Sequence, residues 1–238
     1  MEPDKVLVFK LRGEYAQFRK FFTNMSPLSF SIPPRTALTG ILGAIIGIPK
    51  EENPETYSLS DCFIGLKLLK EVKKMKIAIN YLKTTSKSHF HSFEDHKPTN
   101  VEFLKDVEYR LYFAHNNRDI YERTKTMLEN HSSYYTVSLG ISGCLANIRY
   151  EGEYELVKTK AKDKILMDSI VPYEQIEEIE YDPKLNMQKV TIPCEMKNDR
   201  EVTSYKAVLY EMKGKPIEVK LKESYFFVGG LNEHILPL

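Results

Sequence analysis

The stretch SPLSFSIPPRTALTGILGAIIGIP, residues 26–49, decides how the first part of the chain folds. Its double proline favours an extended entry, because the residue before a proline is pushed out of the α region. Thr36 can then cap a helix, and apolar residues follow at helical spacing as far as Pro49, which ends it. The sequence therefore predicts an amphipathic helix over residues 36–48.

Three glycines interrupt this helix at positions 40, 43 and 47. Each costs roughly 1 kcal/mol relative to alanine, so we expect another backbone or a partner to approach the helix closely. Arg35 stands at the helix start, beside N–H groups that attract phosphate, and is a candidate phosphate ligand. The alternative is a helix packed tightly on its own sheet.

The composition is that of an ordinary globular protein with one or two domains. Of 238 residues, 42% are hydrophobic and 28% charged, and the net charge of +1 says nothing about partners. The distribution is uneven, since residues 67–87 carry seven lysines and one acid, whereas acids outnumber bases in residues 151–201. This indicates two surfaces with different roles, or simply solvated lysines on a twisted strand.

Several classes of protein are disfavoured by what the sequence lacks. The three cysteines are far apart and odd in number, which fits a reducing compartment without disulfides. No signal segment or membrane-length apolar run is present, so we expect a cytoplasmic protein without a membrane partner. No P-loop, G-x-G-x-x-G or G-x-S-x-G motif occurs, and we expect no cofactor.

The pattern of elements predicts an α+β fold. Expected strands cover residues 5–11, 61–82, 101–115 and 136–150, and expected helices cover residues 36–48 and 119–131. This order is the β-α-β-β-α-β pattern of a ferredoxin-like domain, with a long central hairpin at about residues 76–107. We predict one such domain over residues 1–150 and a small β-rich domain over residues 151–238.

The first 48 residues also resemble a known family. Gln17-Phe18-Arg19 follows the first strand, and residues 34–48 read PRTALTGILGAIIGI. This pattern is similar to the N-terminus of the fifth family of CRISPR-associated proteins. That family is the RAMP-superfamily subunit of Cascade-type surveillance complexes. The motif is long enough to be fairly specific, and it covers roughly a fifth of the chain.

The resemblance implies a ferredoxin-like (RRM-like) palm with a protruding β-hairpin thumb and a β-rich C-terminal region. It implies a subunit that holds the 5′ handle of the CRISPR RNA (crRNA) and docks the Cascade backbone and large subunits. Foreign DNA would be met indirectly, through the complex. One branch of the family cleaves repeat RNA with a tyrosine near the end of the opening helix. That place here holds residues 46–48, IGI, and the next tyrosine along the chain is Tyr57.

Basic and aromatic residues could hold single-stranded RNA through phosphates and bases. We assign Arg19, Lys20, Arg35, Lys83 and Lys87 to phosphates, and Phe90 or His91 to bases. For Phe21 and Phe22 two interpretations stay open: they contact the RNA, or they pack over the core.

An alternative function is a metal-independent endoribonuclease that processes CRISPR repeat RNA. Histidines close to Lys87, or the pair His115 and Tyr112, could then act as proton donors and acceptors. The histidines of residues 89–96 could also form a metal cluster, but we predict neither a metal nor a catalytic site. The acidic residues 174–182 would suit a protein partner.

Overall fold

The computed structural model of the 238-residue chain describes residues 2–23, 26–82 and 96–238. The first part contains β1 (Lys5–Ala16), α1 (Arg35–Ile46), α2 (Asn53–Thr56), β2 (Cys62–Leu68), β3 (Lys73–Leu82), β4 (His96–His115), α3 (Arg118–Glu129) and β5 (Asn147–Lys160). The later strands are β6 (Ile165–Met167), β7 (Val171–Pro172), β8 (Ile176–Ile179), β9 (Met187–Met196), β10 (Val202–Glu211), β11 (Ile217–Leu221), β12 (Ser224–Val228) and β13 (Glu233–Ile235). Few helices and mostly antiparallel strands confirm the predicted α+β class.

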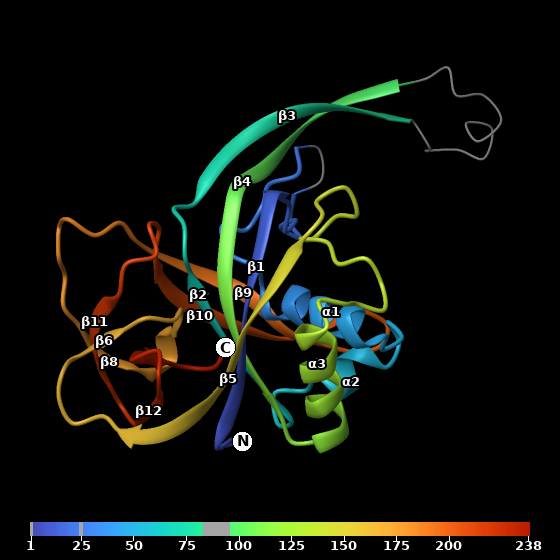
Figure 1. Cartoon of the computed structure of the whole chain (residues 1–238). Helices are drawn as coiled ribbons and strands as arrows, with labels where there is room; N and C mark the ends of the chain where they lie inside the picture. The colour runs from blue at the N-terminus through green and yellow to red at the C-terminus, as the bar shows by residue number, and fades with distance from the viewer. Residues whose placement is uncertain (1, 24–25, 83–95) are drawn as a thin grey trace.

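The main sheet has the strand order β13-β12-β5-β1-β4-β2, and β3 is added to it through β4. The central strand β1 alternates, so that Leu7, Phe9 and Leu11 pack in the core cluster that includes α1. Val6 and Val8 pack in a second cluster, with residues of β12 and β13. Figure 1 shows the helices on one side of the sheet and β6, β8 and β11 on the other. The sheet is therefore covered on both faces.

Helix α1 forms close to where the sequence predicts it. It begins after Pro34, whose ψ of 156° is extended, and ends at Gly47, whose φ of 79° is left-handed. Leu38, Leu42 and Ile45 are fully buried along one side. A Cβ atom added to Gly43 would lie 2.0 Å from Nδ2 of Asn53, so a neighbouring segment of the same chain makes the expected close approach there.

Two expected strands are wrong in their extent. Residues 61–82 form two strands, β2 and β3, which both pair with β4. Between them the amide of Val72 donates to the carbonyl of Met212, outside the β4 ladder. Residues 136–146 form a loop, and the strand begins only at Asn147. Gly140 in this loop has φ of 97°, and a Cβ atom there would lie 1.9 Å from the carbonyl oxygen of Gln17.

Strand β3 and the first half of β4 form a hairpin that projects from the body (Figure 1). Their register runs from Lys73 opposite Lys105 to Leu82 opposite His96. Ile77 and Val101 are opposite each other on a face that packs against the main core. The hairpin is thus attached through apolar contacts at its base.

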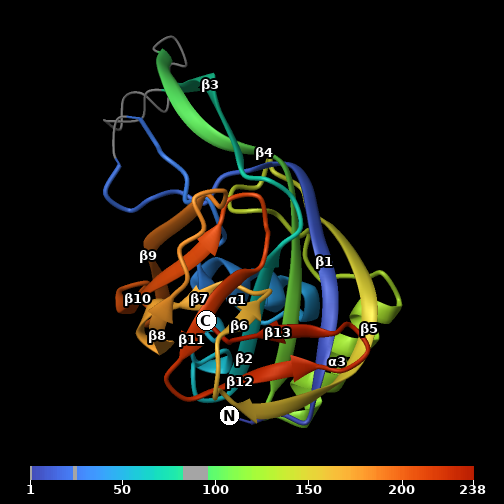
Figure 2. The same ribbon diagram turned by 90° about the vertical axis from the view of Figure 1, so that its left-hand side faces the viewer.

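The C-terminal strands divide between two roles. Strands β12 and β13 extend the main sheet, whereas β7-β10-β9 and β6-β11-β8 form two three-stranded sheets (Figure 2). Met167, Val219 and Leu221 belong to a separate core cluster in this region. The division at residue 150 stays a prediction, and β5 runs across it. No helix within the described ranges is long and apolar enough to cross a membrane.

Candidate nucleic-acid interface

In the loop between β1 and α1 the chain reverses direction, and its two sides are joined by backbone hydrogen bonds. The amide of Lys20 donates to the carbonyl of Leu28 at 2.8 Å, and that of Phe30 to Phe18 at 2.8 Å. Phe18 and Phe30 are 3% and 2% exposed, so they anchor the loop in the core. Between them, Arg19, Phe21 and Phe22 are exposed, whereas Pro27 and Ser29 are buried.

This loop is tied to the base of the β3–β4 hairpin. The amide of Glu102, on β4, donates to the carbonyl of Pro27 at 2.9 Å. A carboxylate oxygen of Glu102 accepts the amide of Ser29 at 3.1 Å and the ammonium of Lys74 at 3.0 Å. The β1–α1 loop and the β3–β4 hairpin, which are about fifty residues or more apart in the chain, therefore form one surface.

The two basic residues assigned to this loop are both near the surface. Arg19 is exposed, and its guanidinium donates to the carbonyl of Thr23 at 3.0 Å. The Lys20 ammonium lies 5.8 Å from the ring centres of both Phe22 and Phe30, which is cation–π distance. Both cations are available to an anion, since neither is bound to a carboxylate of a described residue.

Lys73 and Lys105 add positive charge at the base of the hairpin. They are both exposed and directly opposite each other where β3 and β4 begin to pair. Like charges placed directly opposite in a sheet cost stability, and an anion lying across them would offset that cost. The sequence showed Lys73 only as a member of the lysine-rich residues 67–87, and it did not single out Lys105.

Phe21 and Phe22 do not cover the core, so that alternative is wrong. They are 60% and 63% exposed, and their rings meet edge to face at 5.2 Å between centroids. Tyr205 of β10 lies beside them, with its ring centre 5.5 Å from that of Phe21, and is 46% exposed. Nothing in the sequence indicated that Tyr205 would join them, because it comes from a distant strand.

Arg35 is not at the surface. It is 1% exposed, and its guanidinium donates to the backbone carbonyls of Ser58, Cys62 and Cys194 at 3.1–3.2 Å. Burial lowers the pKa of this guanidinium. In this fold Arg35 joins three segments of the chain, and we leave it out of the RNA surface proposed below.

Four of the assigned residues, Lys83, Lys87, Phe90 and His91, lie outside the described residues. The same holds for His89 and Asp95 of the possible metal cluster. Within the described ranges, no group of three or more His, Cys, Asp or Glu side chains could hold a metal ion.

His115 and Tyr112 do not form a catalytic pair. Nδ1 of His115 accepts the amide of Asn117, which leaves Nε2 to donate to the carbonyl of Thr56 at 2.8 Å. Tyr112 is fully buried on the other face of β4 and donates to Glu233. Both rings have structural partners and no free path to a substrate.

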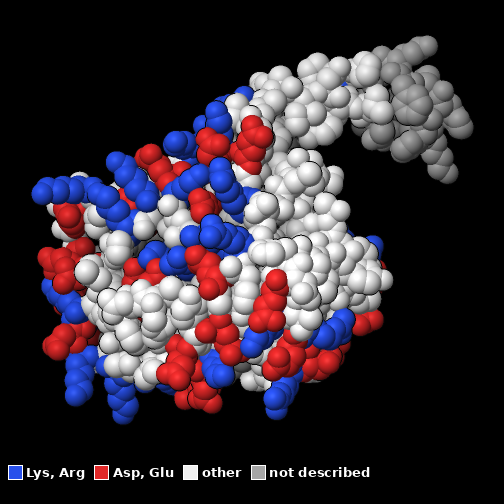
Figure 3. Space-filling model, viewed as in Figure 1, with Lys and Arg blue, Asp and Glu red and all other residues white. Residues whose placement is uncertain are grey.

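The face of the main sheet opposite the helices carries a row of four cations, of which Lys67, Arg110 and Lys10 are paired with carboxylates. Lys67, Arg110, Lys10 and Arg149 follow one another across β2, β4, β1 and β5. Lys67 and Arg110 share Glu233 at 2.7 and 2.6 Å. Lys10 and Arg110 share Glu151 at 2.9 and 2.6 Å. Figure 3 likewise shows acidic and basic side chains interleaved over the body.

This network predicts a loss of stability in acid. Burial raises the pKa of Glu151, but its hydrogen bonds to Arg110 and Lys10 outweigh burial and hold the pKa below its usual range. The stabilisation is therefore present above the unfolded pKa of about 4.3 and is lost as pH falls through the folded value. Urea unfolding from about pH 6 to 3 should show a steady decrease, less steep in Glu151→Gln. Equal slopes would contradict this role.

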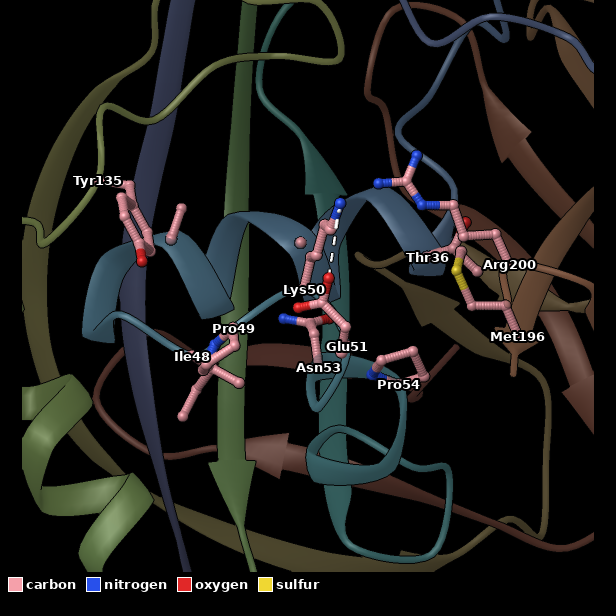
Figure 4. A pocket seen from close by; sticks show the side chains of 12 residues that line it. Thr36, Ile48, Pro49, Lys50, Glu51, Asn53, Pro54, Tyr135, Met196 and Arg200 are labelled. Carbon is pink, nitrogen blue, oxygen red and sulfur yellow. Dashed lines mark ion pairs between the residues drawn. The ribbon is translucent and has the colours of Figure 1, made fainter. Parts of the chain in front are cut away.

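A groove of about 600 Å³ runs along the exposed side of α1 (Figure 4). Thr36, Gly40 and Ala44 form its floor, and a Cβ atom at Gly40 would meet nothing within 4 Å. Its charged lining residues Lys50 and Glu51 pair with each other at 3.5 Å. The groove has room for an apolar side chain but presents no pair of groups suited to acid–base chemistry.

A family model described as CRISPR-associated protein (Cas_Cas5) matches residues 6–198, most of the chain. The chain belongs to the Cas5 family. The match extends well beyond the N-terminal motif and includes the loop, the hairpin and strands β1–β9. No curated protein sequence matches the chain.

Solved structures share the fold of this Cas5 protein. A CRISPR protein from Archaeoglobus fulgidus is 16% identical, with a TM-score of 0.55 and 98% of each chain covered. A chain of a CRISPR RNA-guided surveillance complex is 10% identical, with a TM-score of 0.54 and coverage of 89% of this chain and 91% of that one. At such identities the likeness concerns the fold alone.

A tyrosine does stand at the end of α1 in this Cas5 protein. The amide of Tyr134, in the loop after α3, donates to the carbonyl of Ile45 at 2.9 Å. Its ring lies over Gly47, where a Cβ atom would come within 2.6 Å, and it is 68% exposed. In the sequence the first tyrosine after this helix is Tyr57, and Tyr57 is buried. RNA cleavage therefore has to be measured directly.

Proposed function

We propose that this Cas5 protein is an RNA-binding structural subunit of a Cascade-type antiviral surveillance complex and holds the 5′ handle of the crRNA. The observation that carries the proposal is the joined surface of the β1–α1 loop and the β3–β4 hairpin. Arg19, Lys20, Lys73 and Lys105 bring positive charge to that surface. Basic side chains of this kind follow the phosphates of single-stranded RNA.

In this proposal the sheet β5-β1-β4-β2 with α1 and α3 is a ferredoxin-like palm, and the β3–β4 hairpin is its thumb. Support comes from the chain order of strand, helix, two strands, helix and strand, and from the placement of both helices on one face. The thumb would follow the RNA backbone away from the palm. Residues 151–238 would form the accessory β-rich domain.

The proposed partners are the crRNA, the Cascade backbone subunit and the large subunit, with foreign DNA reached through the complex. The likeness to a chain of an RNA-guided surveillance complex supports this assembly. The acidic residues 174–182 would face a protein, because RNA would be repelled there. The groove along α1 is a further place where an apolar side chain of a neighbour could dock.

RNA binding should weaken with salt in proportion to the number of phosphates neutralised. For single strands the slope of log K against log salt is about 0.7 per phosphate, so Arg19→Ala should lower its magnitude by about that amount. Lys73→Ala should have a similar effect. Fluorescence anisotropy with a labelled handle RNA at several salt concentrations measures both. Lys50→Ala, an exposed lysine at the α1 groove, is the control and should leave the slope unchanged.

The endoribonuclease alternative has a separate test. The pure protein is incubated with its repeat RNA in EDTA, and the RNA is examined on a denaturing gel. We expect the repeat to remain intact. Specific cleavage that is lost in Tyr134→Phe or His91→Ala would show that the protein processes RNA and would overturn the purely structural role.

A further inference from the structure

We infer that Phe21, Phe22 and Tyr205 form an aromatic platform on which unpaired bases of the bound RNA stack. This inference deepens the proposed function and rests on it, since it names the side chains that meet the bases rather than the phosphates. The three residues come from two segments, the β1–α1 loop and strand β10, that meet only in the folded protein.

The geometry of the three rings leaves faces open. Phe21 meets Phe22 edge to face at 5.2 Å and Tyr205 at 5.5 Å with a 54° tilt, so the rings support one another without the parallel stacking that would cover a whole face. All three are 46–63% exposed. A base has a flat apolar face of similar size and can lie against such a ring whatever its sequence identity.

The exposure is not a by-product of anchoring the loop. Phe18 and Phe30 already hold the loop in the core at 3% and 2% exposure. The loop would therefore remain attached without aromatic rings at positions 21 and 22. Adjacent exposed aromatic side chains of this kind mark an interaction surface in most soluble proteins.

The charge around the platform favours nucleic acid over an apolar protein surface. The Lys20 ammonium lies 5.8 Å from the Phe22 ring centre, and the exposed Arg19 immediately precedes Lys20 in the loop. The neighbouring carboxylate of Glu102 is already bound to Lys74 and to the amide of Ser29. Cations next to exposed rings, with the nearby acid neutralised, match the phosphates and bases of a single strand.

The experiment measures stacking and charge separately. Phe22→Leu and Tyr205→Leu keep an apolar side chain but remove the flat ring, and Phe22→Trp restores a larger one. Binding of the 5′-handle RNA is measured by anisotropy at several salt concentrations. A second handle RNA carries 2-aminopurine, whose fluorescence is quenched by stacking, at one position at a time. Phe227→Leu, at a partly exposed phenylalanine of β12, is the matched control.

We expect Phe22→Leu and Tyr205→Leu to bind about tenfold more weakly, with the salt slope unchanged. Quenching should be lost at one or two positions of the handle and recovered in Phe22→Trp, whereas Phe227→Leu should behave as wild type. Wild-type affinity and quenching in both leucine variants would overturn the platform while leaving the proposed function intact. If these variants bind RNA normally but fail to join the neighbouring subunits, the platform contacts protein. Absence of RNA binding by the wild type, alone and in the complex, would overturn both.

Discussion

Replacement of Arg35 by methionine is expected to lower the free energy of unfolding by about 3 kcal/mol or more. The guanidinium donates to the carbonyls of Ser58, Cys62 and Cys194, and methionine removes all three hydrogen bonds from this site. A hydrogen bond to a charged group contributes about 1.5–3 kcal/mol. Urea unfolding followed by circular dichroism measures the difference.

Arg35→Lys is the matched variant, because lysine keeps the charge but has no planar fork to reach three carbonyls at once. We expect an intermediate loss of stability. RNA binding, measured where both variants remain folded, should match the wild type. A stable Arg35→Met variant that fails to bind the handle would instead show that Arg35 binds an RNA phosphate, as its position at the helix start first indicated.

Removal of the Glu233 carboxylate is expected to cost about 3–5 kcal/mol. Glu233 is 6% exposed on β13 and binds Lys67 of β2 together with Arg110 and Tyr112 of β4. Glu233→Ala leaves both cations partly buried without this partner, and loss of one partner from a buried ion network is strongly destabilising. Thermal or urea unfolding of the variant measures the effect.

Glu218→Ala on β11 is the control, because this carboxylate is on an exposed position of a neighbouring strand. It should stay within about 0.5 kcal/mol of the wild type. Because Glu233 attaches β13 to the centre of the sheet, the Glu233→Ala variant should also expose the end of the chain to limited proteolysis. A stability equal to that of the Glu218 control would show that the network contributes nothing to folding.

Local sequence patterns determined most of the elements and the family. Helix α1 could be predicted because its apolar spacing, its proline start and its glycine end are all local signals. Strand β1 begins at Lys5, where the β-branched and aromatic run of residues 5–11 predicted a strand. The loop at residues 136–146 was missed because its β-branched residues Thr136, Val137 and Ile141 resemble a strand, while the carbonyl of Gln17 packs against Gly140.

The tertiary structure decided which residues are available to a ligand. The sequence placed Arg35 among the phosphate ligands and left Phe21 and Phe22 open, whereas the fold buries Arg35 and exposes both rings. It also brought Tyr205 to Phe21 and Tyr134 to Gly47 across more than eighty residues of chain. Periodicity is set by neighbours along the chain, so the sequence alone determined the helices and strands. The exposure of a side chain and its long-range contacts depend on strand register and on the positions of the loops. Register and loop positions exist only once the sheet has formed.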